Sequence, residues 1–173
     1  MIQRKEYLDQ LLGWKEEKVI KVITGIRRCG KSTLLEQFRD MLLEQGVQSD
    51  QIQFMNFEMM ELEPLLEPAA LHKHILEQLV PDKMNYIFLD EIQKVTDYEK
   101  VVDSLYIRNN VDIYITGSNA YLLSGELATL LSGRYVEINM LPLSFAEYCE
   151  ARGNGDKETL FAEYMRRGGF PYA

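Results

Sequence analysis

The sequence predicts an α/β fold in which a parallel β-sheet is joined by crossover helices, and two observations support this prediction. Short runs of β-forming residues alternate along the chain with longer segments of helical periodicity, which is the signature of repeated strand–helix–strand units. Three of the short runs are dense in Ile, Val and Tyr, as expected for strands that helices cover on both faces. The five predicted strands are residues 19–24, 52–56, 86–89, 112–116 and 135–139.

The helices are predicted from the spacing of apolar residues between these strands. In residues 32–45 the apolar side chains recur at helical spacing, and Gly46 follows as a stop signal. Residues 69–79 repeat the pattern before a proline. After the fifth strand, Ser144 and Glu147 form a capping-box pair that predicts the start of a helix. The remaining helices are predicted at residues 98–108, 121–131, 144–152 and 157–167.

The composition places limits on the function. The chain has 173 residues, 46% hydrophobic and 27% charged, which is enough to bury one core without disulfides. Its formal net charge of −8 argues against a duplex or an anionic membrane as the main partner, because both attract basic surfaces. Local basic patches remain, one at Arg27, Arg28 and Lys31 and the other at Arg166 and Arg167.

The compartment is predicted to be the cytoplasm. Only two cysteines occur, Cys29 and Cys149, and free thiols indicate a reducing environment. Residues 1–14 are charged and lack the apolar stretch of a signal peptide. No apolar run is long enough to span a bilayer.

A phosphate-binding loop is predicted between the first strand and the first helix. The residues from Gly25 to Ser32 read Gly-Ile-Arg-Arg-Cys-Gly-Lys-Ser and fit the P-loop pattern G-x-x-x-x-G-K-[S/T] in full. The glycines allow backbone N–H groups to turn toward a phosphate, Lys31 reaches the β- and γ-phosphates, and the Ser32 hydroxyl binds Mg²⁺. The predicted nucleotide contacts are Gly25, Ile26, Arg27, Arg28, Cys29, Gly30, Lys31, Ser32 and Thr33.

An acidic pair follows the third predicted strand. Asp90 and Glu91 end the apolar run that begins at Tyr86, and neighbouring residues at a strand end point in different directions. Asp90 is therefore predicted to hold Mg²⁺ together with Ser32, and Glu91 to polarise the attacking water as general base. The alternative is an ordinary acidic loop start.

Polar residues also follow the fourth and second strands. Thr116, Ser118 or Asn119 is predicted to bind the γ-phosphate or the attacking water, because parallel strands end at the same edge of the sheet. The alternative is that Ser118 or Asn119 only caps the next helix. Asn56 is a candidate to hold Glu91 inactive until a partner arrives, and the alternative, which the sequence favours, is a turn-forming Asn.

Taken in this order, these motifs resemble the AAA-type ATPases of the additional-strand P-loop class. The chain looks most similar to the prokaryotic ATPases described as archaeal-type or Swi2-like. The segments that carry the resemblance are residues 25–32, 87–93, 115–120, 131–137, 141–148 and 168–171. The resemblance implies a five-stranded sheet ordered 5-1-4-3-2, and it implies ATP as the nucleotide.

The same resemblance bears on Arg134 and on the domain organisation. Arg134 stands where this class carries its arginine finger, which acts on the nucleotide of a neighbouring subunit in a homo-oligomer. The alternative is an arginine that pairs with an acidic residue at a strand start. Residues 1–140 are predicted to be the ATPase core and 141–173 the start of a truncated C-terminal helical region, since the family is usually longer.

The leading hypothesis is therefore Mg-dependent ATP hydrolysis coupled to an unseen module or partner. The first alternative is an ATP-binding switch with little turnover, and the presence of Glu91 favours hydrolysis over this alternative. A third hypothesis, a P-loop kinase for small molecules, lacks a recognisable acceptor site. Whether the partner is a protein or DNA is left open, and no membrane partner is predicted.

Overall fold

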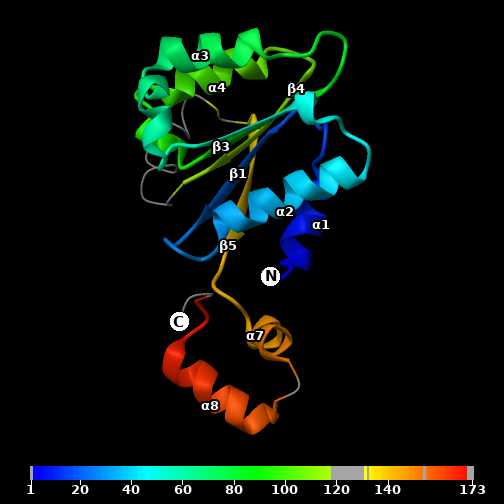
Figure 1. The fold of residues 1–173 in the computed structure, drawn as a ribbon, viewed down its shortest axis with the longest axis vertical. Helices are drawn as coiled ribbons and strands as arrows, with labels where there is room; N and C mark the ends of the chain where they lie inside the picture. Colours follow the sequence, from blue (N-terminus) through cyan, green and yellow to red (C-terminus); the bar gives the residue numbers. More distant parts are fainter. Residues whose placement is uncertain (1, 118–130, 132, 154, 171–173) are drawn as a thin grey trace.

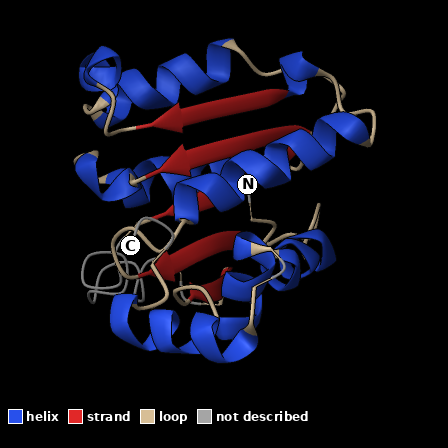
Figure 2. Ribbon diagram, turned by 60° about the horizontal axis from the view of Figure 1, so that its bottom comes forward, coloured by secondary structure: helices blue, strands red, loops and turns tan. Residues whose placement is uncertain are grey.

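The fold is a parallel five-stranded sheet with helices on both faces (Figures 1 and 2). The computed structural model describes residues 2–117, 131, 133–153 and 155–170. The strands follow the order β2-β3-β4-β1-β5, and every neighbouring pair is parallel. This is the order that the family resemblance implies, so the predicted fold class is confirmed. The strands are β1 (Ile20–Gly25), β2 (Ile52–Asn56), β3 (Asn85–Asp90), β4 (Val111–Thr116) and β5 (Tyr135–Met140).

The helices divide between the two faces of the sheet. Side chains of α1 (Lys5–Gly13) and α2 (Lys31–Glu44) pack on one face, and those of α3 (Pro68–Glu77) and α4 (Tyr98–Tyr106) on the other. After β5, α7 (Phe145–Arg152) and α8 (Lys157–Arg167) form a separate pair beyond the end of that strand (Figure 1). Short 3-10 helices also occur, at η1 (Ser49–Gln51), η2 (Met60–Leu65) and η3 (Ile92–Lys94).

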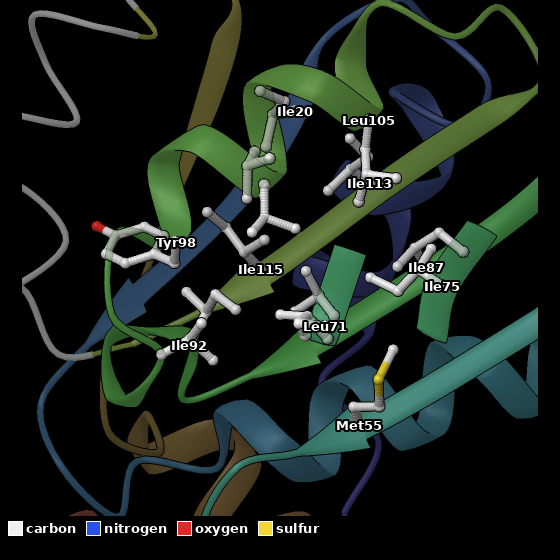
Figure 3. Close-up of a cluster of buried hydrophobic side chains, with 14 of the residues drawn as sticks. Ile20, Met55, Leu71, Ile75, Ile87, Ile92, Tyr98, Leu105, Ile113 and Ile115 are labelled. Atoms are coloured by element: carbon white, nitrogen blue, oxygen red, sulfur yellow. The ribbon is translucent and has the colours of Figure 1, made fainter. Parts of the chain in front are cut away.

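Successive side chains of each strand point to opposite faces of the sheet, and this alternation produces two separate cores. Ile20 and Val22 of β1 face α3 and α4, whereas Ile23 faces α1 and α2, as the two-residue period of a strand requires. The first core is mainly aliphatic and includes Leu71 of α3 and Leu105 of α4 (Figure 3). The second core combines aliphatic side chains of α1 and α2 with a group of aromatic rings from Phe38, Phe54, Phe88 and Tyr114, which stack, tilt or meet edge-on.

The predicted elements agree with the structure except at the chain start and at some boundaries. All five strands begin and end within one residue of their predicted positions. The helix α1 was not anticipated, because in this charged segment only Leu8 and Leu11 are buried. The predicted helix 121–131 lies outside the described residues except for Leu131. The predicted capping box of Ser144 and Glu147 is present at the start of α7.

A buried polar network anchors the amino-terminal edge of the sheet. The Lys21 ammonium donates to Oδ1 of Asp112 at 2.5 Å, and both side chains are at most 1% exposed. The second oxygen of Asp112 accepts from the Tyr114 hydroxyl at 2.7 Å and from the Glu16 N–H at 2.8 Å. Asp112 is thus a buried carboxylate with a partner for each oxygen, which is the condition under which burial of a charge is tolerated.

The helices after β5 are held together by aromatic contacts and one backbone bridge. Phe145 of α7 packs against Phe161 and Tyr164 of α8. The Leu143 N–H donates to the Gly169 carbonyl at 2.6 Å, and a Cβ on Gly169 would lie 2.3 Å from the Leu143 carbonyl oxygen. The Gly-Gly turn therefore closes this unit by a close approach of two backbones.

Among the described helices, none combines the length and the apolar character that crossing a membrane would require.

Candidate functional site

The register of the sheet brings the carboxyl ends of its strands together. Asn56 at the end of β2 pairs with Asp90 at the end of β3, and Gly25 at the end of β1 pairs with Met140 of β5. Thr116 ends β4 beside Ile23 of β1. The polar residues that the sequence places after separate strands therefore gather at one edge, where ligands bind in open parallel sheets.

The loop from Gly25 to Gly30 has a backbone conformation that depends on its glycines. Gly25 has φ +152° and Gly30 has φ +103°, a region that side chains with a Cβ rarely adopt. A Cβ on Gly25 would lie 2.4 Å from the carbonyl oxygen of Met140, so the close pairing of β1 with β5 excludes any larger residue. Gly30 is also the N-cap of α2, and the helix begins directly behind the loop.

This loop borders a cavity of about 290 Å³. Two loop arginines, the start of α2 and two carboxylates form its lining, namely Arg27, Arg28, Gly30, Lys31, Ser32, Thr33, Glu58 and Glu91. Among the described residues, no backbone acceptor pairs with the N–H groups of Gly30, Lys31 or Ser32, and the Lys31 N–H contacts the Cys29 sulfur. N–H groups without a backbone acceptor at a helix start form a natural site for an anion, because the helix dipole adds a partial positive charge there.

The nine predicted nucleotide contacts separate into two groups. Six of them line the cavity, from Arg27 and Arg28 to Gly30 through Thr33. Gly25 and Cys29 belong to the loop but do not line the cavity. Gly25 allows the close approach to β5, and the fully buried Cys29 packs in the second core. Burial raises the pKa of the Cys29 thiol, which disfavours the reactive thiolate. The Ile26 side chain is half exposed.

Lys31 is buried and lies between the loop and the acidic pair. Its side chain is 4% exposed, and the Nζ atom lies 3.7 Å from Oε1 of Glu91. The same Nζ donates to the carbonyl oxygens of Gly25 and Ile26, both at 3.4 Å. These contacts are long for hydrogen bonds, so the ammonium is held near the cavity without a short partner.

Asp90 carries an unpaired buried oxygen. The Thr116 hydroxyl donates to Oδ1, whereas Oδ2 is buried and has no hydrogen-bond partner. Burial raises the pKa of Asp90, and Thr116 and Ser32 act in the opposite direction. A buried carboxylate oxygen without a donor is costly unless a cation or donor satisfies it, so the predicted pair of Asp90 and Ser32 fits a Mg²⁺ site.

No cluster of three or more His, Cys, Asp or Glu side chains that could hold a metal is found among the described residues. A Mg²⁺ ion at Asp90 would therefore need most of its ligands from water and phosphate, which is how Mg²⁺ binds at nucleotide sites.

Of the three residues predicted to contact the γ-phosphate or the attacking water, Thr116 is the one that the structure describes. Its side chain is fully buried, and its hydroxyl donates to Asp90 while accepting the Glu91 N–H at 3.0 Å. Thr116 ties the end of β4 to the acidic pair of β3. The sequence did not show this, because the contact depends on the register of the two strands.

Glu91 is held by Gln93 rather than by Asn56. The side-chain nitrogen Nε2 of Gln93 donates to Oε2 of Glu91. The side-chain oxygen Oε1 of Gln93 is buried without a hydrogen-bond partner. The Asn56 side chain accepts the Glu58 N–H at 2.9 Å, which is the turn-forming role given above as its alternative. Glu91 itself has φ +55°, a strained value that turns its carboxylate away from the strand and toward Lys31.

Two of the predicted catalytic residues lie outside the described part of the chain, and a third lies away from the cavity. Ser118 and Asn119 are not among the described residues. Arg134 precedes β5, and its neighbour Tyr135 pairs with Ile20 at the start of β1. Arg134 therefore lies near the amino-terminal end of β1, whereas Gly25 lies at the carboxyl-terminal end. It forms an ion pair with Asp103 of α4 and stacks over Tyr106.

A comparison with protein families gives one match for most of the chain. The family model described as an AAA domain matches residues 17–149. This range includes the phosphate loop, the acidic pair and all five strands.

Two curated relatives also align with nearly the whole chain. An uncharacterized protein of Haemophilus influenzae is 47% identical over 178 residues, covering 99% of this chain and 44% of the relative. An uncharacterized protein of Methanocaldococcus jannaschii is 32% identical over 168 residues, covering 88% of this chain and 35% of the relative. The chain therefore spans less than half the length of these two relatives.

Solved structures share the fold at low sequence identity. The Walker-type ATPase PABY2304 of Pyrococcus abyssi superposes with a TM-score of 0.65 and 16% identity, covering 99% of this chain and 65% of that chain. Cdc6p from Pyrobaculum aerophilum gives a TM-score of 0.61 and 12% identity, covering 92% of this chain and 55% of that chain. At such identities the likeness concerns the arrangement of the sheet and helices.

Proposed function

Because the chain belongs to the AAA domain family of P-loop ATPases, we propose that its cavity binds ATP together with Mg²⁺ and that Glu91 activates water to hydrolyse the nucleotide. The observation that carries the proposal is the convergence of Lys31, Ser32 and Glu91 on one cavity, together with the buried, unpartnered Oδ2 atom of Asp90. A cation, a hydroxyl and two carboxylates at a phosphate loop are the groups that phosphoryl transfer to water requires.

In this proposal the loop and the start of α2 bind the phosphates. The N–H groups of Gly30, Lys31 and Ser32 donate to phosphate oxygens, and the Lys31 ammonium pairs with the β- and γ-phosphates. The long contacts of Lys31 in the resting structure support this role, because an ammonium without a short partner loses little when it turns to an anion. The choice of adenine rests on the family.

Mg²⁺ would be held by the Ser32 hydroxyl and, directly or through water, by Oδ2 of Asp90. The bound ion supplies positive charge that offsets the charge on the transferring phosphoryl group. The unpaired state of Oδ2 supports this assignment. Thr116 holds the other oxygen of Asp90 and thereby sets the orientation of the carboxylate.

Glu91 would act as general base in hydrolysis. It removes a proton from a water molecule whose oxygen attacks the γ-phosphorus, and the bond from that phosphorus to the β–γ bridging oxygen breaks, releasing ADP and phosphate. The place of Glu91 on the cavity wall, next to Lys31, supports this role. Gln93 orients the carboxylate through Oε2.

The remaining assignments concern partners. Arg134 is proposed to act as an arginine finger on the nucleotide of a neighbouring copy of the chain. It lies too far from the cavity of its own chain to act there, because it precedes the residue that pairs with the start of β1. Ser118 and Asn119 stay proposed contacts of the γ-phosphate or the attacking water. Since the relatives are more than twice as long, we propose that the nucleotide state is passed to a module or partner outside these residues.

The test compares ATP binding and ATP turnover in the wild type and two variants, each with a matched control. Lys31→Ala is expected to weaken binding, whereas Glu91→Gln is expected to bind ATP and lose about 10²–10⁴ in rate. Lys73→Ala and Glu77→Gln serve as controls, because this exposed pair on α3 lies outside the cavity and its loss costs well under 1 kcal/mol. Binding is measured by calorimetry and turnover by phosphate release at high protein concentration, so that any oligomer forms.

Three outcomes would decide between the proposal and its alternative. Binding and turnover that change as expected support the ATPase. A wild type that binds Mg-ATP without turnover at any protein concentration would replace hydrolysis with the ATP-dependent switch. A wild type that binds no nucleotide would overturn the proposal as a whole.

A further inference from the structure

Arg4 is a buried arginine that lies outside the residues matched by the family model. It precedes α1, yet its side chain is only 5% exposed, and the family match begins at residue 17. A fully charged guanidinium is rarely buried unless several acceptors surround it. The acceptors around Arg4 therefore indicate what its burial accomplishes.

The guanidinium joins three segments that are far apart in the sequence. Its Nε donates to Oε1 of Glu147 in α7 at 2.7 Å. One terminal nitrogen donates to the Leu141 carbonyl at 2.9 Å, and the other donates to the Cys29 carbonyl at 3.4 Å. The Tyr7 ring lies under the guanidinium at 4.8 Å, and the Tyr7 hydroxyl accepts the Leu141 N–H at 3.1 Å.

The contact with Cys29, although long at 3.4 Å, is made to one peptide of the phosphate loop. No cis peptide occurs among the described residues, and in a trans peptide the C=O and the following N–H point in opposite directions. The Cys29 carbonyl that binds Arg4 shares its peptide with the Gly30 N–H. Arg4 and Cys29 do not line the cavity, whereas Gly30 does. Holding this carbonyl outward therefore keeps the Gly30 N–H directed at the cavity.

We propose that Arg4 is a positioning residue of the phosphate-binding loop. Its guanidinium, which Glu147 of α7 holds in place, keeps the loop in its anion-binding conformation. The proposal rests on the proposed function of the loop and extends it, because it makes phosphate affinity depend on a residue that cannot touch the phosphate. Peptides that are already turned toward an anion lose less conformational freedom when the anion binds.

Glu147 supplies the support. One of its oxygens pairs with Arg4, and the other accepts the Ser144 N–H and hydroxyl at 2.8 and 2.9 Å. The same carboxylate thus caps the start of α7 and holds the guanidinium. A displacement of α7 would move Arg4 and, through it, the Cys29–Gly30 peptide, so α7 is placed to influence the phosphate loop.

The experiment separates positioning from general stabilisation. Arg4→Met retains an unbranched stem and removes the guanidinium, and Arg4→Lys retains the charge with a single ammonium in place of the fork. Asp156→Ala is the matched control, because it removes the cap of α8, and Asp156 contacts neither Arg4 nor Glu147. Dissociation constants for ATP and for tripolyphosphate, which has phosphates without a base, are measured by calorimetry at 15 °C, alongside thermal unfolding.

Arg4→Met is expected to weaken ATP and tripolyphosphate by the same factor of about 10, comparable to the loss of one hydrogen bond to a charged group. Arg4→Lys should fall between this variant and the wild type. Asp156→Ala should lower the melting temperature and keep both dissociation constants within about twofold of the wild type, as expected for a lost cap.

Two results would overturn the proposal. One is a folded Arg4→Met variant that binds both ligands like the wild type. The other is an Asp156→Ala variant that weakens the binding of both ligands as much as Arg4→Met does. If Arg4→Met does not fold, Glu147→Gln is measured instead. Glutamine still completes a capping box, so this variant removes only the negative charge that holds Arg4. Unchanged dissociation constants in Glu147→Gln would also contradict the proposal. A wild type that binds neither ligand would overturn the proposed function rather than the role of Arg4.

Discussion

Replacing Asp90 with asparagine is expected to stabilise the protein in the absence of Mg²⁺. The Oδ2 atom is buried and has no donor, and an unsatisfied buried group costs about 1–3 kcal/mol, with charged groups at the upper end. Asparagine keeps an acceptor for the Thr116 hydroxyl and replaces the charged oxygen with a neutral amide. The expected gain is about 1–2 kcal/mol, which corresponds to roughly 2–8 °C in melting temperature for a chain of this size.

The dependence on pH gives a second test of the same reasoning. Burial raises the pKa of Asp90 above its ordinary value of 3.8, so the folded state binds this proton more tightly than the unfolded state does. The free energy of unfolding of the wild type therefore falls as pH rises from 3.8 through the raised pKa. The variant lacks this group, and its advantage should grow over that window and disappear below pH 3.8, where both side chains are neutral.

Asp112→Asn is the matched control, because Asp112 is equally buried and has a partner for each oxygen. Removing its charge leaves the buried Lys21 ammonium without its counter-charge, which is expected to cost about 3–5 kcal/mol. Thermal unfolding without and with Mg-ATP measures both variants, and only Asp90→Asn should lose the stabilisation by the ligand. A melting temperature of Asp90→Asn at or below that of the wild type at pH 7 without Mg²⁺ would refute the reasoning.

Three further predictions concern the loop, the base and the neighbouring subunit. Gly25→Ala should destabilise the fold by at least about 2 kcal/mol in chemical denaturation, because the new Cβ would meet the Met140 carbonyl at 2.4 Å, and a stable variant would contradict the geometry. Gln93→Ala should lower the turnover number about tenfold and leave the ATP dissociation constant unchanged, because it removes the contact that orients Glu91. A changed ATP affinity with an unchanged turnover number would exclude Gln93 as the residue that orients the base. Arg134→Ala should be inactive alone and regain turnover when mixed with Glu91→Gln, which supplies an intact Arg134 in trans, and a mixture without activity would argue against the finger.

The fold and the outline of the site could be predicted because they follow from short-range features of the chain. The phosphate loop is defined by eight consecutive residues between a strand and a helix, and the acidic pair follows directly on the apolar run of β3. In a parallel sheet these two segments must meet at one edge. Their convergence on one cavity required no knowledge of side-chain contacts.

The contacts within the site could not be predicted, because they depend on register and rotamers. Thr116 reaches Asp90 only because Leu89 pairs with Ile115, across 26 residues of sequence. Gln93 reaches Glu91 because the chain turns at φ +55° immediately after β3. No composition or spacing signal distinguishes Gln93 from Asn56 as the partner of Glu91. The buried Arg4 was missed for a similar reason, since its acceptors come from segments 25 to 143 residues away.

The ion pair of Lys31 and Glu91 also bears on the order of events in the proposed reaction. The two charged groups lie 3.7 Å apart, so in the absence of nucleotide the Glu91 carboxylate is the counter-charge of the Lys31 ammonium. A triphosphate carries several negative charges against the single charge of Glu91, and it draws Lys31 away when it binds. Glu91 is then released from the ion pair and can accept a hydrogen bond from water, while Gln93 and the Thr116 hydroxyl still fix its position. ATP binding would therefore precede the contact between Glu91 and the attacking water, so that the water is oriented only when a γ-phosphate is present to be attacked.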